Sequence, residues 1–110
     1  MEADMPIVIL VTAKNVREAN KIANKLIEGK LVACANVIKG ISSIFRWQGK
    51  VDMAKETLLI LKSKKSCFPK IVKMVKKYHS YDVPEIIALP ITDGSKDYLN
   101  WIKSNCSTKR

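Results

Sequence analysis

The sequence has no long apolar run, and this shortage excludes a membrane-spanning helix. Its longest apolar runs, such as residues 7–11, fall far short of the ~20 residues that cross a bilayer. The run at 7–11 follows an acidic start, with Glu2 and Asp4, whereas a secretory signal begins with basic residues. We therefore expect a cytoplasmic protein with no membrane partner.

Residues for catalysis and for redox or zinc chemistry are scarce as well. His79 is the only histidine, so a single side chain could serve as a base at neutral pH. The four glycines stand apart from one another and form no glycine-rich phosphate loop. Cys34, Cys67 and Cys106 are widely spaced without a C-x-x-C pair, which indicates reduced thiols and no zinc knuckle. The sequence predicts that the protein is not an enzyme.

Positive charge is what the sequence has in excess. Twenty Lys and Arg residues against ten Asp and Glu give a net charge of +10, which favours anionic partners. Only three of the twenty are arginines, and lysine lacks the planar guanidinium group with which arginine recognises bases. Binding of nucleic acid would rest on charge alone, so we do not expect it. The stretch 62–77 holds seven lysines and no acidic residue, which predicts either a solvated face or an anion-binding one.

The 110 residues, 47% of them hydrophobic, suffice for one domain over 1–110 with a core at about 6–104. Asn15 with Glu18 three residues later predicts a helix start, and Gly29 is expected as its left-handed cap. Gly40 predicts a bulge, and Gln48-Gly49 predicts a hairpin turn. The patterns predict strands at 7–11 (buried on both faces), 31–47, 50–62 and 85–91, and helices at 16–28, 68–78 and 96–104.

The predicted order of elements is β-α-β-β-α-β with an added C-terminal helix. This order is typical of the α+β class with a ferredoxin-like split βαβ fold, in which helices pack on one face of an antiparallel sheet. Many unrelated functions use this fold. The stretch 56–62 of the predicted third strand carries no aromatic residue on which RNA bases would stack. No cysteine pair follows the first strand, where a copper chaperone would need one.

Six short motifs occur in register along the chain. They are Thr12-Ala13, the block LVACAN at 31–36, W-x-G-K at 47–50, Glu56-Thr57, H-x-Y-x-V-P-E at 79–85, and Y-L-x-W at 98–101. Together they closely resemble the CutA divalent-cation tolerance family over about residues 7–102. The resemblance implies a small ferredoxin-like homotrimer linked to the response to, and tolerance of, divalent metal ions. It also implies copper binding.

Transferred residue by residue, the family's copper site retains one ligand in this chain. That site uses a cysteine in the first strand and two consecutive histidines, at positions occupied here by Val11, Tyr78 and His79. Only His79 matches. We therefore expect weak binding of copper or another divalent metal centred on His79, and no required cofactor. The alternative function is an anion- or nucleotide-binding regulatory module that uses the lysine-rich face.

The expected trimer has candidate interface residues. The hairpin strands at 31–47 and 50–62 exceed the usual length of roughly 5–6 residues, so they should project beyond their own helices. Phe45 and Trp47 lie near the end of this hairpin, and closed rotational symmetry would cover its exposed edge. We expect Phe45, Trp47 and Trp101 at the interface, with Trp101 on a C-terminal helix that covers a neighbour's edge. The resemblance, and not the residue pattern, gives three as the number of subunits.

Overall fold

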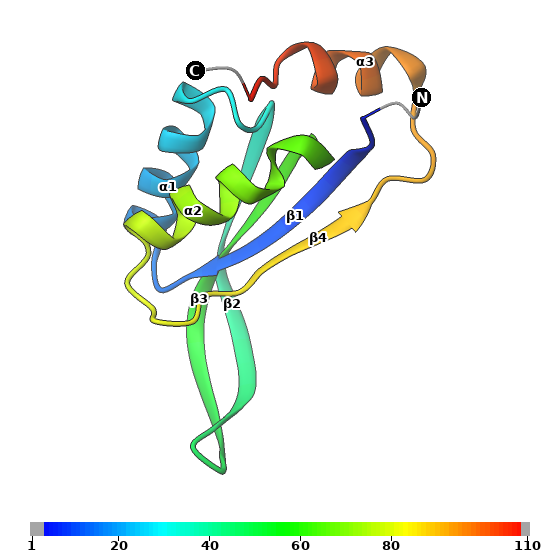
Figure 1. Ribbon diagram of the computed structural model, residues 1–110. Helices are drawn as coiled ribbons and strands as arrows, with labels where there is room; N and C mark the ends of the chain where they lie inside the picture. The colour runs from blue at the N-terminus through cyan, green and yellow to red at the C-terminus, as the bar shows by residue number, and fades with distance from the viewer. Residues whose placement is uncertain (1–3, 109–110) are drawn as a thin grey trace.

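The computed structural model describes residues 4–108, which form a four-stranded antiparallel sheet with three α-helices (Figure 1). The elements in chain order are β1 (Pro6–Ala13), α1 (Val16–Glu28), β2 (Cys34–Trp47), β3 (Lys50–Lys64), α2 (Phe68–Tyr78), β4 (Ile86–Pro90) and α3 (Lys96–Ser104). The predicted order and the ferredoxin-like α+β class are confirmed. Within the described chain, every helix is too short or too polar to span a bilayer.

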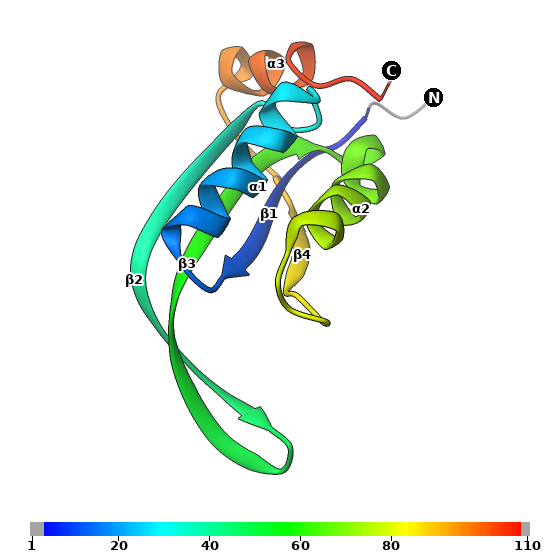
Figure 2. The ribbon, with the colours of Figure 1, turned by 90° about the vertical axis from the view of Figure 1, so that its left-hand side faces the viewer.

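β1 lies inside the sheet, whose strand order is β2-β3-β1-β4. It pairs antiparallel with β3 on one side and with β4 on the other. Ile9 and Val11 face the helices and are completely buried, while Val8 and Leu10 face the other way and are half-buried. The expectation that β1 is buried on both faces is therefore wrong, because α1 and α2 cover only one face of the sheet (Figure 2).

α1 begins where the sequence predicts, because Asn15 Oδ1 accepts a hydrogen bond from the backbone N–H of Glu18 at 2.9 Å. Its apolar face packs into the core beside α2. The buried apolar residues of the core are Ile7, Ile9, Val11, Ala13, Ala19, Ile22, Ala23, Leu26, Leu31, Val32, Leu59, Leu61, Cys67, Ile71, Val75, Ile102 and Cys106.

α1 ends at Glu28 as predicted, but the left-handed residue after it lies one position later than expected. Gly29 keeps a right-handed conformation with φ −78°, and the left-handed residue is Lys30 with φ 59°. The N–H of Lys30 bonds to the Ile27 carbonyl, and that of Leu31 bonds to the Leu26 carbonyl, each at 3.0 Å. This pair of bonds is a Schellman motif in which the left-handed position falls on a lysine. The chain therefore turns later, and β2 starts at Cys34 rather than at residue 31.

The β2–β3 hairpin extends well past the helices, as expected (Figures 1 and 2). Its register shifts between Ile38 and Ile41, where Gly40 has φ 75°. At its tip, Gln48 and Gly49 both have positive φ, at 49° and 78°, as a two-residue type I′ turn requires. Both the bulge and the turn are confirmed. We call residues 41–56 the hairpin arm.

Candidate functional site

A cleft of about 710 Å³ lies where the hairpin arm meets the end of β1 and the loop at 79–85. Its lining contains carboxylates, aromatic rings and no lysine or arginine. The lining residues are Thr12, Ser43, Ile44, Phe45, Trp47, Asp52, Glu56, Ser80, Tyr81, Asp82, Val83 and Glu85. Four of the ten acidic residues of the chain, Asp52, Glu56, Asp82 and Glu85, therefore line one cleft of a protein with net charge +10. We call it the acidic cleft.

His79 directly follows α2, and its ring is fully buried next to the acidic cleft. The backbone N–H of Tyr81 donates to His79 Nδ1 at 3.0 Å. Because Nδ1 accepts this bond, Nε2 carries the proton of the neutral ring and donates it to the Thr12 carbonyl oxygen at 2.7 Å. The imidazole ring thus connects the loop after α2 to the end of β1, and both of its nitrogens take part in hydrogen bonds.

Tyr81 connects this loop to the base of the hairpin arm. Its hydroxyl donates to Glu56 Oε2 at 2.7 Å, and Glu56 is 8% exposed. Burial, the hydrogen bond to Glu56 and the negative charges of Glu56 and Glu18 raise the pKa of Tyr81 to about 12. Tyr81 therefore stays protonated at neutral pH and holds the Glu56 carboxylate in place.

Glu18, on the first turn of α1, approaches His79 from the other side. Its two oxygens accept the backbone N–H groups of Lys14, at 3.2 Å, and Ser80, at 2.9 Å. Burial alone would raise the pKa of Glu18, but the hydrogen bonds from Ser80 and Lys14 outweigh it and hold the pKa below its ordinary value. Glu18 Oε1 also lies 3.8 Å from His79 Nδ1, so a carboxylate and an imidazole face each other.

The residues around His79 do not fit a resident metal ion. Between residues 4 and 108 there is no group of three His, Cys, Asp or Glu side chains close enough to hold one ion. Cys67 lies at the opposite end of α2, about 16 Å away for 11 residues of helix, and Cys106 contacts Ser63 in the core. What the geometry offers a metal is the pair of His79 Nδ1 and Glu18, once Nδ1 gives up its hydrogen bond.

The three residues expected at a subunit interface are all partly exposed, but they do not lie together. Phe45 and Trp47, 40% and 58% exposed, line the acidic cleft on the hairpin arm. Trp101, 44% exposed, lies on α3 at the other end of the molecule (Figure 1). Its ring stacks on Tyr98, with centroids 5.5 Å apart. If all three are interface residues, the contacts with neighbouring subunits therefore involve both ends of this chain.

Comparison with known proteins places this geometry in a family. The model of the CutA1 divalent ion tolerance protein matches residues 7–105. The chain is 45% identical to the divalent-cation tolerance protein CutA of Thermus thermophilus, over 89% of this chain and 95% of that protein. It is 46% identical to the chloroplastic protein CutA of Arabidopsis thaliana, over 90% of this chain but 54% of that longer protein.

Solved structures agree with the sequence comparisons. The structure of the divalent cation tolerance protein Cut A1 from Thermus thermophilus superposes with a TM-score of 0.92 at 44% identity. The match covers 94% of this chain and 100% of that one. The family model spans most of the chain, and these two relatives are 45% and 46% identical to it over the aligned residues. The chain therefore belongs to the CutA1 divalent ion tolerance family.

Proposed function

We propose that this chain acts as a homotrimer in the response to, and tolerance of, divalent metal ions, as a binding protein rather than an enzyme. The observation that carries the proposal is the acidic cleft, which gathers four carboxylates in a chain of net charge +10. Carboxylate oxygens attract divalent cations, and the surrounding positive charge leaves the cleft as the favoured place for them. Membership of the family supports the same role.

We propose that copper binds weakly, with His79 as its main ligand. Imidazole suits Cu(II), and Glu18 Oε1 lies 3.8 Å from His79 Nδ1, so the two side chains can share an ion. Binding at Nδ1 displaces the hydrogen bond from the Tyr81 N–H, and this cost lowers the affinity. Two ligands and one broken hydrogen bond fit a transient contact rather than a permanent metal centre.

The hairpin arm supports the trimer. Ile44, Val51 and Met53 are 64–70% exposed on the arm, and the free edge of β2 runs beside them. An apolar arm with an unpaired edge is a surface that a second chain can cover. A cyclic assembly covers it in every subunit at once, and the number three comes from the family resemblance.

Two further features support a cytoplasmic protein that is not an enzyme. Cys34, Cys67 and Cys106 are all unpaired within residues 4–108, which fits a reducing compartment. Both nitrogens of His79 bond to backbone groups, so the single histidine would have to break a hydrogen bond before it could act as a general base. The Arabidopsis relative is named chloroplastic, so members of this family occur in more than one compartment.

Calorimetric titration with Cu(II) tests the proposal. We expect binding weaker than about 1 μM in the wild type, loss of binding in His79→Ala, and several-fold weaker binding in Glu18→Gln. Glu28→Gln is the matched control, because Glu28 is exposed on the same helix, and it should bind like the wild type. Submicromolar binding that survives His79→Ala would contradict the proposal and direct attention to the cysteines. Circular dichroism verifies that each variant is folded.

A further inference from the structure

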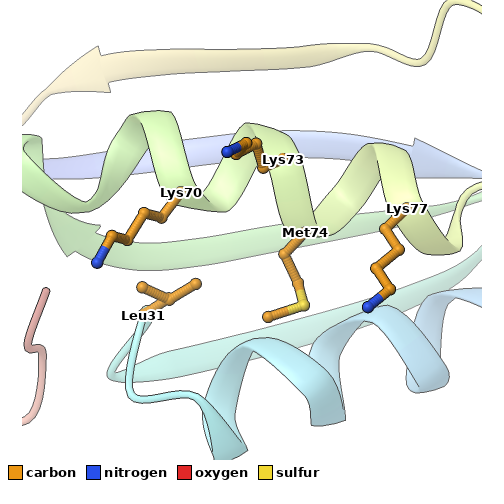
Figure 3. A pocket seen from close by; sticks show the side chains of 5 residues that line it. All are labelled: Leu31, Lys70, Lys73, Met74 and Lys77. Carbon is orange, nitrogen blue, oxygen red and sulfur yellow. The ribbon is translucent and has the colours of Figure 1, made fainter. Parts of the chain in front are cut away.

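A second hollow, which we call the lysine groove, lies beside α2 and shares no lining residue with the acidic cleft. It has a volume of about 440 Å³ and is lined by Leu31, Lys70, Lys73, Met74 and Lys77. Figure 3 shows Lys70 and Lys77 at its two ends, with Leu31 and Met74 between them. Its floor is therefore apolar, while its rim carries three ammonium groups.

Among the residues that the structure describes, no carboxylate forms an ion pair with a lysine of this rim. The ion pairs among residues 4–108 are those of Lys64 with Asp4 and of His79 with Glu18, and neither involves a lysine of the groove. Lys70 donates a hydrogen bond to the Thr108 carbonyl oxygen, which is a neutral group. The rim of the lysine groove is thus a site of concentrated positive charge, not a salt-bridged surface.

Further lysines crowd the same helix pair. α1 packs against α2, and Lys21 and Lys25 of α1 approach the ring of Tyr78 together with Lys77 of α2. The three ammonium nitrogens lie 5.4–5.5 Å from the ring centroid. The ring face attracts each cation, but the cations repel one another, as do lysines four residues apart on one helix. A bound polyanion would relieve this repulsion.

We infer that the lysine groove binds a small polyanion that carries two or more adjacent phosphate groups next to an apolar part. Lysine holds phosphate as a point charge and needs no fixed fork geometry. The volume falls within the roughly 300–1,000 Å³ of small-molecule pockets, which favours a soluble ligand over a flat membrane surface. The apolar floor of Leu31 and Met74 accepts the non-phosphate part of the ligand.

The inference is tested by calorimetry with inorganic tripolyphosphate and with ATP, at about 20 mM and about 200 mM salt. The test variant is the pair Lys73→Gln and Lys77→Gln. The matched control is the pair Lys39→Gln and Lys76→Gln, which removes the same charge at exposed sites outside the groove, with Lys76 on the same helix. Vesicles of phosphatidylserine form a third arm that probes a membrane surface.

We expect both phosphates to bind at low salt, with ATP the tighter ligand because the floor contacts its apolar part. The test pair should weaken binding by about tenfold or more, and the control pair by less than about twofold. Equal losses in the two pairs would overturn the inference in favour of diffuse charge. Absence of binding at low salt would also overturn it, as would binding to vesicles without binding to either soluble phosphate.

Discussion

The two halves of β3 both place large apolar side chains two residues apart on one face, but these side chains have opposite environments. In the half under the helices, Leu59 and Leu61 are completely buried. In the hairpin arm, Val51 and Met53 have the same two-residue spacing but are 68% and 64% exposed. The comparison shows that the two-residue spacing of apolar side chains predicts which of them share a face, while their burial depends on what covers that face.

Element lengths explain why one half lies uncovered. α1 has 13 residues and is about 20 Å long, whereas the 15 residues of β3 span about 50 Å. A single layer of such helices covers only part of the strand. The remainder, which is the hairpin arm, extends beyond the subunit's own core and needs a different cover.

The largest expected effect compares Leu59→Ala with Met53→Ala. Leu59→Ala leaves a cavity in the core and should lower the free energy of unfolding by about 3 kcal/mol, measured by chemical denaturation. Met53 lies on the exposed arm, so the cost of Met53→Ala should come only from assembly and should shrink as protein concentration falls. Equal costs at every concentration would show that the arm is part of the subunit's own core, against the structure.

The next effect concerns assembly. Trp47→Ala removes a large exposed ring from the arm and should weaken self-association by about 2 kcal/mol, the scale of an interface hot spot. Sedimentation should show a trimer for the wild type and a shift toward the 12.4 kDa monomer for the variant. Trp101→Ala should shift the equilibrium in the same direction. A wild-type monomer at micromolar concentration would refute the assembly.

The smallest expected effect concerns the hydrogen bond of Glu56, which lies where the two halves of β3 meet. Tyr81→Phe removes the hydrogen bond to Glu56 and should cost about 1 kcal/mol of stability at neutral pH. The pKa of Tyr81 is about 12 in the fold and about 10 when unfolded, so its contribution is complete below pH 10 and falls as pH rises toward 12. Stability measured from about pH 9 to pH 11 should fall less steeply in Tyr81→Phe than in the wild type. Parallel curves would contradict the pKa shift.

Most of the fold was predictable because its signals are local. The Asn15 cap, the Gly40 bulge and the Gln48-Gly49 turn each depend on neighbouring residues alone. The left-handed residue after α1 was predicted one position early because glycine usually takes that conformation, whereas here Lys30 does. The partial exposure of Val8 and Leu10 was missed because an apolar run does not reveal that α1 and α2 cover the same face of the sheet.

The site was less predictable, since its contacts join distant segments. The sequence placed Tyr81 and Glu56 in separate motifs, but their hydrogen bond spans 25 residues and needs the sheet register to be known. The approach of Glu18 to His79 joins residues 61 positions apart. The motifs indicated that Glu56, His79 and Tyr81 matter. Only the structure shows that Glu18 and Glu56 both contact the loop at 79–85. The role of His79 in metal binding stays a prediction.

The strand order β2-β3-β1-β4 has a consequence for synthesis. β1 is made first, yet it pairs with residues 57–64 and 86–90. In the nascent chain, both edges of the apolar strand β1 are therefore unpaired until β3 emerges from the ribosome. β2 and β3, by contrast, can form their hydrogen bonds locally, starting from the two-residue turn that joins them. During translation the strand that ends up in the centre is the one exposed to aggregation, and the hairpin that ends up exposed is the first segment able to pair.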